Sequence, residues 1–426
     1  MQPVIAAIDF GTSNSTVGIM QGGQPVLLQP EAGKDAVPTA LFFPHGKTTP
    51  IPANGAIQAY LGEDPGRFMR GLKGVLGTGL FNESTQLGTQ PVTFKEIIAS
   101  YIGWLVKTAE AELGHPVTHL MLGRPVHFLT NQPEADAVAE SQLREVVATL
   151  GIPHLAFMAE PLAAAYHYEH TLQQEELALI IDIGGGTADF SLLRLGPKLK
   201  DTTDRSKDIL ATHGLRLGGA MLDQAFAMTE VMPTFGRGTQ IAGPTGPKGL
   251  TVPEGYFTQL TTWHRIHRMY ERKTLQEANG VLQEALEPHK VERLIRLLEE
   301  RGGHKLMLDI EGAKITLSKT AETLLNLGWI ERELALPLTA EALATATQTW
   351  MNTLTESIHH TLAKADTAAE NLTTAPITVF VTGGPSAMPL VQATIRRALP
   401  HSHIILGDQL TSVGTGLVLA AHRHFA

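Results

Sequence analysis

The chain contains no cysteine among its 426 residues. This absence excludes disulfides, thiolate metal sites, iron–sulfur clusters and cysteine nucleophiles. The chain also lacks a basic excess, because 33 Lys and Arg face 42 Asp and Glu, giving a formal net charge of −9. A nucleic-acid groove normally carries clustered positive charge. The composition therefore predicts no nucleic-acid partner and no sulfur-dependent chemistry.

Long apolar runs are missing as well. No segment approaches the roughly 18 to 20 apolar residues of a membrane span, and the run Val4–Ile8 is ended by Asp9 without a basic segment before it. We therefore expect no membrane contact, no signal peptide and a cytoplasmic location. Hydrophobic residues still make up 43% of the chain, enough for a large core, and the length predicts two or three domains.

Apolar runs and helical patterns alternate along the chain. Strands are expected at Val4–Ile8, His119–Leu122, Leu177–Ile183 and Ile377–Thr382. Helices are expected at Phe94–Leu113, Pro133–Leu150, Pro161–Tyr168 and Val413–His422. The same landmarks recur in the same order in both halves, which predicts a duplicated α/β lobe. We place lobe I at residues 1–172, with an inserted subdomain at about 35–115, and lobe II at residues 173–426, with an insertion at about 228–310.

The tract Gly236–Gly255 is rich in glycine and proline. Such composition is typical of irregular structure, so we expect a mobile loop there without a regular element. The segment Tyr256–Glu300 that follows is charged and helical in pattern. It is expected to belong to a small subdomain.

Two short loops follow buried strands and have the composition of phosphate-binding turns. Gly184-Gly-Gly-Thr187 is bracketed by Asp182 and Asp189, and Gly11-Thr-Ser-Asn14 follows Asp9. Backbone amides of such loops can surround phosphate oxygens because glycine has no Cβ, and nearby carboxylates suit magnesium and its waters. The predicted phosphate-binding residues are Gly11, Thr12, Ser13, Asn14, Gly184, Gly185, Gly186 and Thr187.

Further motifs carry a resemblance to a known family. They are Asp9-Phe-Gly-Thr-Ser-Asn14, Asp182-Ile-Gly-Gly-Gly-Thr187-Ala-Asp189, Ala159-Glu160-Pro161-Leu-Ala-Ala-Ala165, Leu217-Gly-Gly219-Ala-Met-Leu-Asp223, Glu311-Gly-Ala-Lys314-Ile-Thr-Leu-Ser318 and Val381-Thr-Gly-Gly384. Together they resemble the actin-like ATPase superfamily, and within it the DnaK-type heat-shock chaperones. The stretch Leu122-Gly-Arg-Pro-Val-His-Phe128 is most similar to the YegD-like branch. The resemblance implies an α/β fold with two duplicated actin-like (ribonuclease H-like) lobes around an ATP cleft.

The resemblance also implies roles for individual residues. The expected catalytic set is Asp9, Lys73, Glu160, Asp182 and Thr187, with Asp9 and Asp182 holding Mg²⁺ through water. The expected nucleotide contacts beyond the phosphate loops are Gly218, Gly219, Glu311, Lys314, Ser318, Gly383 and Gly384. Positioning and charge stabilisation dominate phosphoryl transfer, so dispersed carboxylates and one cation suffice chemically.

The sequence departs from the family pattern at the base-binding positions. Ile315 and Ala387 stand where the family has the two arginines that sandwich the adenine. Because stacking of a cation on a ring contributes about 0.5 to 2 kcal/mol, we expect a weaker grip on adenine or a relaxed base preference. The chain ends at Ala426, directly after the last expected lobe helix. We therefore also expect no peptide-binding domain.

The function expected from these features is a magnesium-dependent ATP-binding protein with slow hydrolase activity, similar to the nucleotide-binding domain of a DnaK chaperone. Expected ligands and partners are ATP or ADP, Mg²⁺, and another chaperone or a client protein. Two alternatives stay open: a non-hydrolysing nucleotide-sensing partner or co-chaperone, and a filament-forming relative of actin or MreB. A sugar kinase is a weaker alternative. The pairs His264/His267 and His359/His360 are interpreted as solvated helix positions and not as metal ligands.

Overall fold

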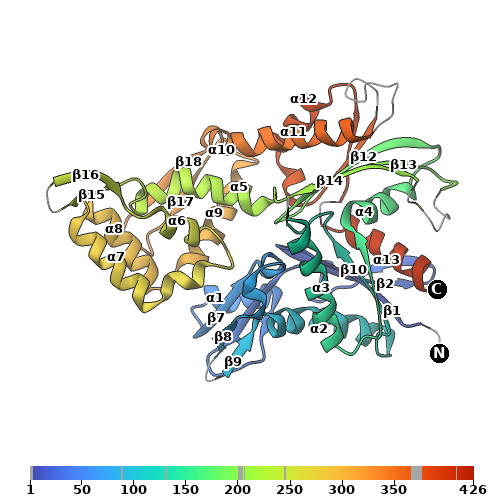
Figure 1. Ribbon diagram of the computed structural model, residues 1–426, viewed down its shortest axis with the longest axis horizontal. Coiled ribbons are helices and arrows are strands. Elements are labelled where there is room, and N and C mark those ends of the chain that lie inside the picture. Colours follow the sequence, from blue (N-terminus) through green and yellow to red (C-terminus); the bar gives the residue numbers. More distant parts are fainter. Residues whose placement is uncertain are drawn as a thin grey trace. The chain divides into compact units, whose positions relative to one another are not determined.

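The computed structural model describes residues 3–87, 90–129, 132–199, 205, 207–243, 246–365, 377–408 and 410–426. The chain divides into two compact units (Figure 1). The first contains Met1–Gly219 and Thr353–Ala426, and the second contains Ala220–Asn352.

Two sheets of identical topology build the first unit. One has the order β11-β10-β1-β2-β3, with β4 also paired to β2, and the other has the order β14-β13-β12-β19-β20. The first sheet comprises β1 (Ile5–Phe10), β2 (Asn14–Gln21), β3 (Gln24–Leu27), β4 (Ala36–Pro38), β10 (His119–Arg124) and β11 (His154–Ala159). The second comprises β12 (Glu176–Ile183), β13 (Ala188–Leu195), β14 (Ile209–Leu215), β19 (Thr378–Thr382) and β20 (His403–Leu406).

The pairing directions of the two sheets also correspond. β1 and β12 each pair antiparallel with the next strand of the chain, β2 or β13. On the other side each pairs parallel with a strand reached through a helical crossover, β10 or β19. The predicted α/β fold with two duplicated actin-like lobes is confirmed by this arrangement.

The helices α4 (Glu160–Glu169) and α13 (Ser412–Phe425) occupy equivalent places after β11 and β20 and pack against each other (Figure 1). Their alanine and glycine content has a packing reason. A Cβ on Gly416 would lie only 1.7 Å from the carbonyl oxygen of Ala163, so the two backbones are in direct contact. Residues of both helices share one core with β1, β10, β12 and β19.

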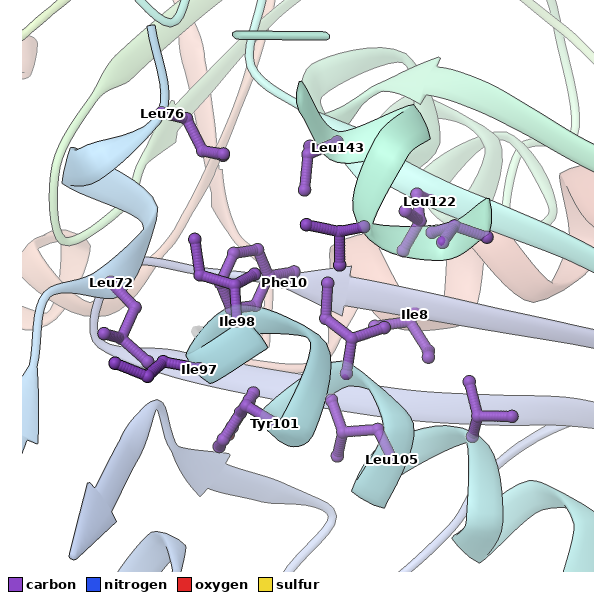
Figure 2. Close-up of a cluster of buried hydrophobic side chains, with 14 of the residues drawn as sticks. Ile8, Phe10, Leu72, Leu76, Ile97, Ile98, Tyr101, Leu105, Leu122 and Leu143 are labelled. Atoms are coloured by element: carbon purple, nitrogen blue, oxygen red, sulfur yellow. The ribbon is translucent and has the colours of Figure 1, made fainter. Parts of the chain in front are cut away.

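A second core lies on the other face of the first sheet. Figure 2 shows side chains of β1, α2 (Phe94–Leu113) and the 3₁₀ segment Leu72–Val75 gathered there. The apolar positions Ile97, Ile98, Tyr101 and Leu105, spaced three and four residues apart, are fully buried as their helical spacing predicts. The side chain of Thr93 caps the helix through a reciprocal bond pattern with Glu96. This core fixes the end of β1, where Asp9 stands.

The other elements of the first unit complete the two lobes. They are β5 (Ala40–Pro44), β6 (Ile51–Pro52), α1 (Ala53–Leu61), β7 (Gly66–Arg70), the 3₁₀ segment Gly79–Asn82, β8 (Ser84–Leu87), β9 (Gln90–Thr93), α3 (Pro133–Thr149), the 3₁₀ segment Gly384–Ala387, α12 (Pro389–Ala398) and part of α11 (Gln348–Lys364). Proline stands in the first turn of α3, α4 and α12, where its missing N–H costs no intrahelical bond.

The second unit is mostly helical. Its helices are α5 (Gly219–Phe226), α6 (Glu254–Leu260), α7 (Arg272–Glu284), α8 (Pro288–Glu299), α9 (Gly303–Leu317) and α10 (Ala340–Ala346). Shorter helical segments are Ala227–Val231, Met232–Phe235 and Ile266–Tyr270. Its hairpins are β15 (Gln240–Gly243) with β16 (Gly246–Thr251), and β17 (Glu322–Asn326) with β18 (Ala335–Thr339). The expected helical character of Tyr256–Glu300 is confirmed.

The expectation of irregular structure in Gly236–Gly255 is wrong. Strands β15 and β16 form an antiparallel hairpin within this tract. Their backbone is stabilised by partners remote in sequence, since Leu286 N donates to Gln240 O, and Ile241 forms a bridge with Ala285. Composition alone cannot reveal such pairing. In the described part of the chain, no helix combines the length and the apolar character needed to cross a bilayer.

Candidate functional site

The two predicted phosphate loops face each other. One joins β1 to β2, and the other joins β12 to β13. A Cβ on Gly185 would lie 2.1 Å from Oγ of Ser13, and one on Gly186 would lie 2.6 Å from Oγ1 of Thr12. The loops therefore touch only because the second one consists of glycine. Residues of both loops are half-exposed.

Three more glycines bring backbone close to the second loop. A Cβ on Gly218 would lie 2.3 Å from backbone atoms of Gly185 and Gly186. The amide of Gly219 donates to the carbonyl oxygen of Gly184 at 2.9 Å. Gly383 has a φ of +87°, and a Cβ there would lie 2.1 Å from the carbonyl oxygen of Ile183. The predicted Gly-Gly motifs therefore converge on the end of β12.

The remaining loop positions form tight turns. The amide of Gly184 donates to the carbonyl oxygen of Thr187 at 2.9 Å, which places the Thr187 hydroxyl at the end of its loop. In the other loop, a Cβ on Gly11 would lie 2.1 Å from the carbonyl oxygen of Asn14. Gly384 is exposed and begins the 3₁₀ segment after β19. Both turns are thus tight and contain glycine, which is typical of loops that bind anions.

A buried charged cluster lies beside the loops. Glu160 is the first residue of α4, and Lys73 lies on the 3₁₀ segment after Gly71. The Nζ of Lys73 is 2.5 Å from Oε1 of Glu160, and the two side chains are 7% and 8% exposed. Gly123 of β10 lies between the carboxyl groups, because a Cβ there would be 3.4 Å from Cγ of Glu160 and 3.5 Å from Oδ1 of Asp9.

The cluster perturbs the protonation of its members. Burial, with the negative charge of Glu160, raises the pKa of Asp9 to about 7. Burial likewise raises the pKa of Asp182 well above its usual value, and Glu160 and Asp189 add to this effect. For Lys73, burial alone would lower the pKa, but the charges of Glu160 and Asp9 outweigh it and raise the pKa. The site therefore favours positive charge among its carboxylates.

Asp189 belongs to the same cluster, although the predicted catalytic set omits it. Burial and the charge of Glu160 raise the pKa of Asp189 to about 8, although Val126 N donates to its Oδ1 at 2.7 Å. Its Oδ2 is buried without a hydrogen bond of regular geometry from the described residues, and the nearby Thr187 hydroxyl lowers the pKa of Asp189 in part. The available signal was its position two residues after Thr187, on the strand that pairs Asp189 with Asp182.

These carboxylates fit a hydrated cation better than a directly ligated one. Among the described residues, no group of three or more His, Asp or Glu side chains is arranged to ligate a metal ion. The buried Oδ2 of Asp189 and the raised pKa of Asp9 and Asp182 show unsatisfied demand for positive charge. Mg²⁺ retains several waters and binds through one or two carboxylates plus phosphate oxygens. The donor set is consistent with Asp9 and Asp182 holding Mg²⁺ through water.

The predicted adenosine-contacting residues Glu311, Lys314 and Ser318 lie along α9 in the second unit. Lys314 is buried, and its Nζ lies 2.7 Å from Oδ1 of Asp223. Asp223 ends the Leu-Gly-Gly motif, so two of the motifs quoted above meet through this ion pair. Ser318 donates its hydroxyl to the Lys314 carbonyl oxygen, and Glu311 is half-buried. Ile315 points outward with 53% of its surface exposed.

Comparison with known proteins agrees with this geometry. Residues 75–242 match the family model described as Hsp70 protein. Over 218 residues, 51% of this chain, the sequence is 30% identical to the chaperone protein DnaK of Mycoplasmopsis agalactiae, covering 33% of that protein. Over 222 residues, 52% of this chain, it is 30% identical to DnaK of Mycoplasma mycoides subsp. mycoides, covering 34% of that protein.

The alignments thus span about a third of the length of these curated relatives. Together with the duplicated lobes, they show that part of the chain is similar to Hsp70 proteins. The placement in the YegD-like branch stays a prediction.

Proposed function

We propose that this protein binds ATP and ADP with Mg²⁺ between its two phosphate loops and hydrolyses ATP slowly. The observation that carries the proposal is the contact of Thr12 and Ser13 with Gly185 and Gly186 beside a buried cluster of carboxylates with one lysine. Loops of this kind bind phosphate oxygens, and the resemblance to DnaK supports a nucleotide as their source.

The chain's own residues supply positioning and charge. The hydroxyls of Thr12, Ser13 and Thr187 and the loop amides would bind phosphate oxygens. The Lys73 ammonium, oriented by Glu160, would bind the terminal phosphate and the attacking water. Such positioning lowers the barrier because the donors do not need to reorganise during the reaction.

The acidic residues would bind the hydrated metal ion and orient water. Asp9 and Asp182 would hold the waters of Mg²⁺, which supplies charge neutralisation for the phosphates when bound. Asp189, with one oxygen held by the Val126 amide, would orient a water through the other. This division fits their raised pKa values, because a cation favours the ionised form.

Calorimetry with ADP, ATP and GTP, with and without Mg²⁺, tests binding. We expect ADP to bind with Mg²⁺ and to bind more weakly after EDTA treatment. For turnover, Asp182→Asn should abolish phosphate release, while the exposed Asp64→Asn, a matched control, should leave it unchanged. Absence of both nucleotide binding and turnover in the unmodified protein would contradict the proposal.

A non-hydrolysing nucleotide sensor is the second candidate. Two observations favour it: Lys73 is already held by Glu160, and the exposed Ile315 and Ala387 offer no cation to a base. In that case ADP and ATP bind, and phosphate release is the same in Lys73→Ala as in the unmodified protein. Equal affinity for GTP and ATP would support the relaxed base preference in either case.

The partner and the location stay predictions. We propose another chaperone or a client protein as the partner that reads the nucleotide state, in the cytoplasm. A filament-forming relative of actin or MreB would sediment in an ATP-dependent manner, and a sugar kinase would phosphorylate a hexose. Sedimentation with ATP and a hexose panel separate these alternatives from the leading proposal.

A further inference from the structure

A pocket of about 460 Å³ lies in the first unit apart from the two phosphate loops. It is lined by the ends of β10 and β14, the first turns of α3 and the last turns of α11. Its polar lining residues are Arg124, His127, Gln132, Asp136, Glu140, His213, His360 and Lys364. Volumes of 300 to 1,000 Å³ are typical of small-molecule sites. The class of ligand that this pocket could bind therefore depends on the charges and hydrogen-bonding groups of these side chains.

The carboxylates on the α3 side are already neutralised. Arg124 pairs with Asp136 at 3.2 Å through Nη2 and with Glu140 at 2.5 Å through Nη1. Asp136 also accepts the amide of Phe128, and Glu140 accepts a second arginine, Arg144, at 2.9 Å. The two carboxylates thus face two guanidinium groups. They leave little negative charge for a cationic ligand.

The α11 side carries donors that are not committed in this way. The ring of His213 packs edge-on against that of His360, with centroids 4.8 Å apart. Within the described ranges, no ion pair and no side-chain hydrogen bond is formed by His213, His360 or Lys364. Opposite them, His127 is half-exposed, with its Nδ1 3.8 Å from Asp136. Protonated imidazole and ammonium donate hydrogen bonds but accept none.

The backbone adds to this polarity. Gln132 and Pro133 line the pocket at the start of α3, a helix of 17 residues. Helix N-termini carry partial positive charge and unpaired N–H groups. The pocket thus combines a helix N-terminus, uncommitted basic side chains and acids that are already paired.

We propose that this pocket binds a small molecule carrying a phosphate or another multiply charged oxyanion, held by His213, His360 and Lys364 with the assistance of His127. The ligand class follows from the donors, since the Lys364 ammonium binds oxyanions through charge-assisted hydrogen bonds and the imidazole N–H groups donate further hydrogen bonds. The site goes beyond the nucleotide site, because none of its lining residues belongs to the phosphate loops or to the carboxylate cluster.

The state of His213 without ligand agrees with this assignment. Burial, together with the positive charges of His360, Lys364 and His127, lowers the pKa of His213 to about 4. The facing acids Asp136 and Glu140 are paired with arginine and do not reverse the lowering of the His213 pKa. A bound oxyanion would offset the repulsion among these groups. Binding should therefore take up a proton and tighten as the pH falls.

Histidine NMR during a phosphate titration tests the proposal, with chloride at equal ionic strength as reference. Inorganic phosphate is the probe, and ADP with Mg²⁺, at a concentration equal to that of the protein, fills the nucleotide site. The His213 resonance is assigned by its loss in His213→Gln. We expect phosphate to raise the apparent pKa of His213 by about one unit. Lys364→Gln should weaken phosphate binding about tenfold.

Matched controls lie elsewhere on the surface. Lys47→Gln and His45→Gln change exposed residues outside the pocket and should leave the phosphate response unchanged. A His213 resonance that does not respond to phosphate, or an equal response in Lys364→Gln, would overturn the proposal. Nucleotide binding is measured separately by calorimetry. A pocket that does not bind phosphate would therefore not contradict the nucleotide proposal, and a chain that does not bind nucleotide would not contradict the pocket proposal.

Discussion

The Nζ of Lys73 lies 2.5 Å from Oε1 of Glu160, and both side chains are buried although they are 87 positions apart in the sequence. Lys73 is the one ammonium beside the carboxyl groups of Asp9, Glu160, Asp182 and Asp189 in the described site. Its charge lowers the pKa of the acids, while burial raises it. The pair therefore lowers the negative charge of the proposed nucleotide site, and we expect it to stabilise the fold.

Replacing Lys73 with Met should impair stability and turnover together. Breaking a buried ion pair typically costs about 3 to 5 kcal/mol, because the remaining charge is left unpaired. We expect the free energy of unfolding at pH 8 to fall by about 3 kcal/mol, and less at pH 6, where the acids can take up protons. ATP turnover should fall at least about 100-fold. Urea unfolding and phosphate release measure the two effects.

The double variant Lys73→Met/Glu160→Gln is the internal check. Removing the partner charge should restore part of the stability but none of the turnover. Lys95→Met removes an exposed lysine that pairs with Glu145 at 3.2 Å, and it should change stability by less than about 1 kcal/mol. Equal losses in Lys73→Met and Lys95→Met would contradict the argument.

Stability without ligand should decline as the pH rises. The pKa of Asp9 is raised to about 7 and that of Asp189 to about 8 in the folded protein, against 3.8 for an ordinary Asp. At pH values between the unfolded pKa of 3.8 and these raised folded pKa values, the folded state binds more protons than the unfolded state. The free energy of unfolding therefore falls from about pH 4 to about pH 8. Each group contributes up to about 1.4 kcal/mol per pH unit in this window.

Urea unfolding at several pH values, in EDTA and without nucleotide, measures this slope. Asp189→Asn removes one titrating group and should make the slope shallower. Asp64→Asn changes an exposed residue and should keep it. If stability instead rises from pH 5 to pH 8 in the unmodified protein, these carboxyl groups are ionised in the folded state, and the assignment is wrong.

Local patterns of apolar residues in the sequence predicted much of the fold. The apolar runs predicted at Val4–Ile8 and Leu177–Ile183 correspond to β1 and β12, the central strands of two sheets with the same order. Glycine in α13 was informative because Gly416 contacts the backbone of Ala163. The hairpin in Gly236–Gly255 could not be predicted, since its strand pairing also depends on Ala285 and Leu286, more than thirty residues away.

Part of the candidate site could likewise be predicted from the sequence. Loop composition located Thr12, Ser13, Gly185 and Gly186, and the structure brings these residues into contact. The role of Asp189 depends on burial and on the Val126 amide, which is supplied by a distant segment. Likewise, the contact of His213 with His360 arises only when β14 and α11 come together. Such relationships have no periodic or local signature in a sequence.

Glycine substitutions should separate two neighbouring positions. A Cβ on Gly218 would lie 2.3 Å from backbone atoms of Gly185 and Gly186, whereas a Cβ on Gly184 would meet nothing closer than 3.6 Å. Gly218→Ala should therefore displace the phosphate loop and weaken ADP binding at least about tenfold. Gly184→Ala should change it by less than about threefold. Calorimetry compares the two, and equal affinities would show that the loop is not part of the binding site.

Binding of ADP with Mg²⁺ should release protons near pH 7. The raised pKa values mean that Asp9 and Asp189 hold protons for part of the time at this pH. A bound cation favours the ionised form, so these protons leave on binding. Calorimetry in two buffers of different ionisation enthalpy measures their number, and Asp189→Asn should reduce it. Identical heats in both buffers would contradict the expected linkage.

In the second unit, Lys314→Met tests whether this lysine stabilises the fold or contacts nucleotide. Lys314 and Asp223 are buried at 2.7 Å, so the substitution leaves a buried carboxylate without its cation. We expect a loss of about 3 kcal/mol in the free energy of unfolding, which Lys314→Met/Asp223→Leu should partly restore. Lys319→Met, at an exposed position, is the matched control. If Lys314→Met leaves stability unchanged but weakens ADP binding, the lysine acts on the nucleotide, and its ion pair contributes little to the fold.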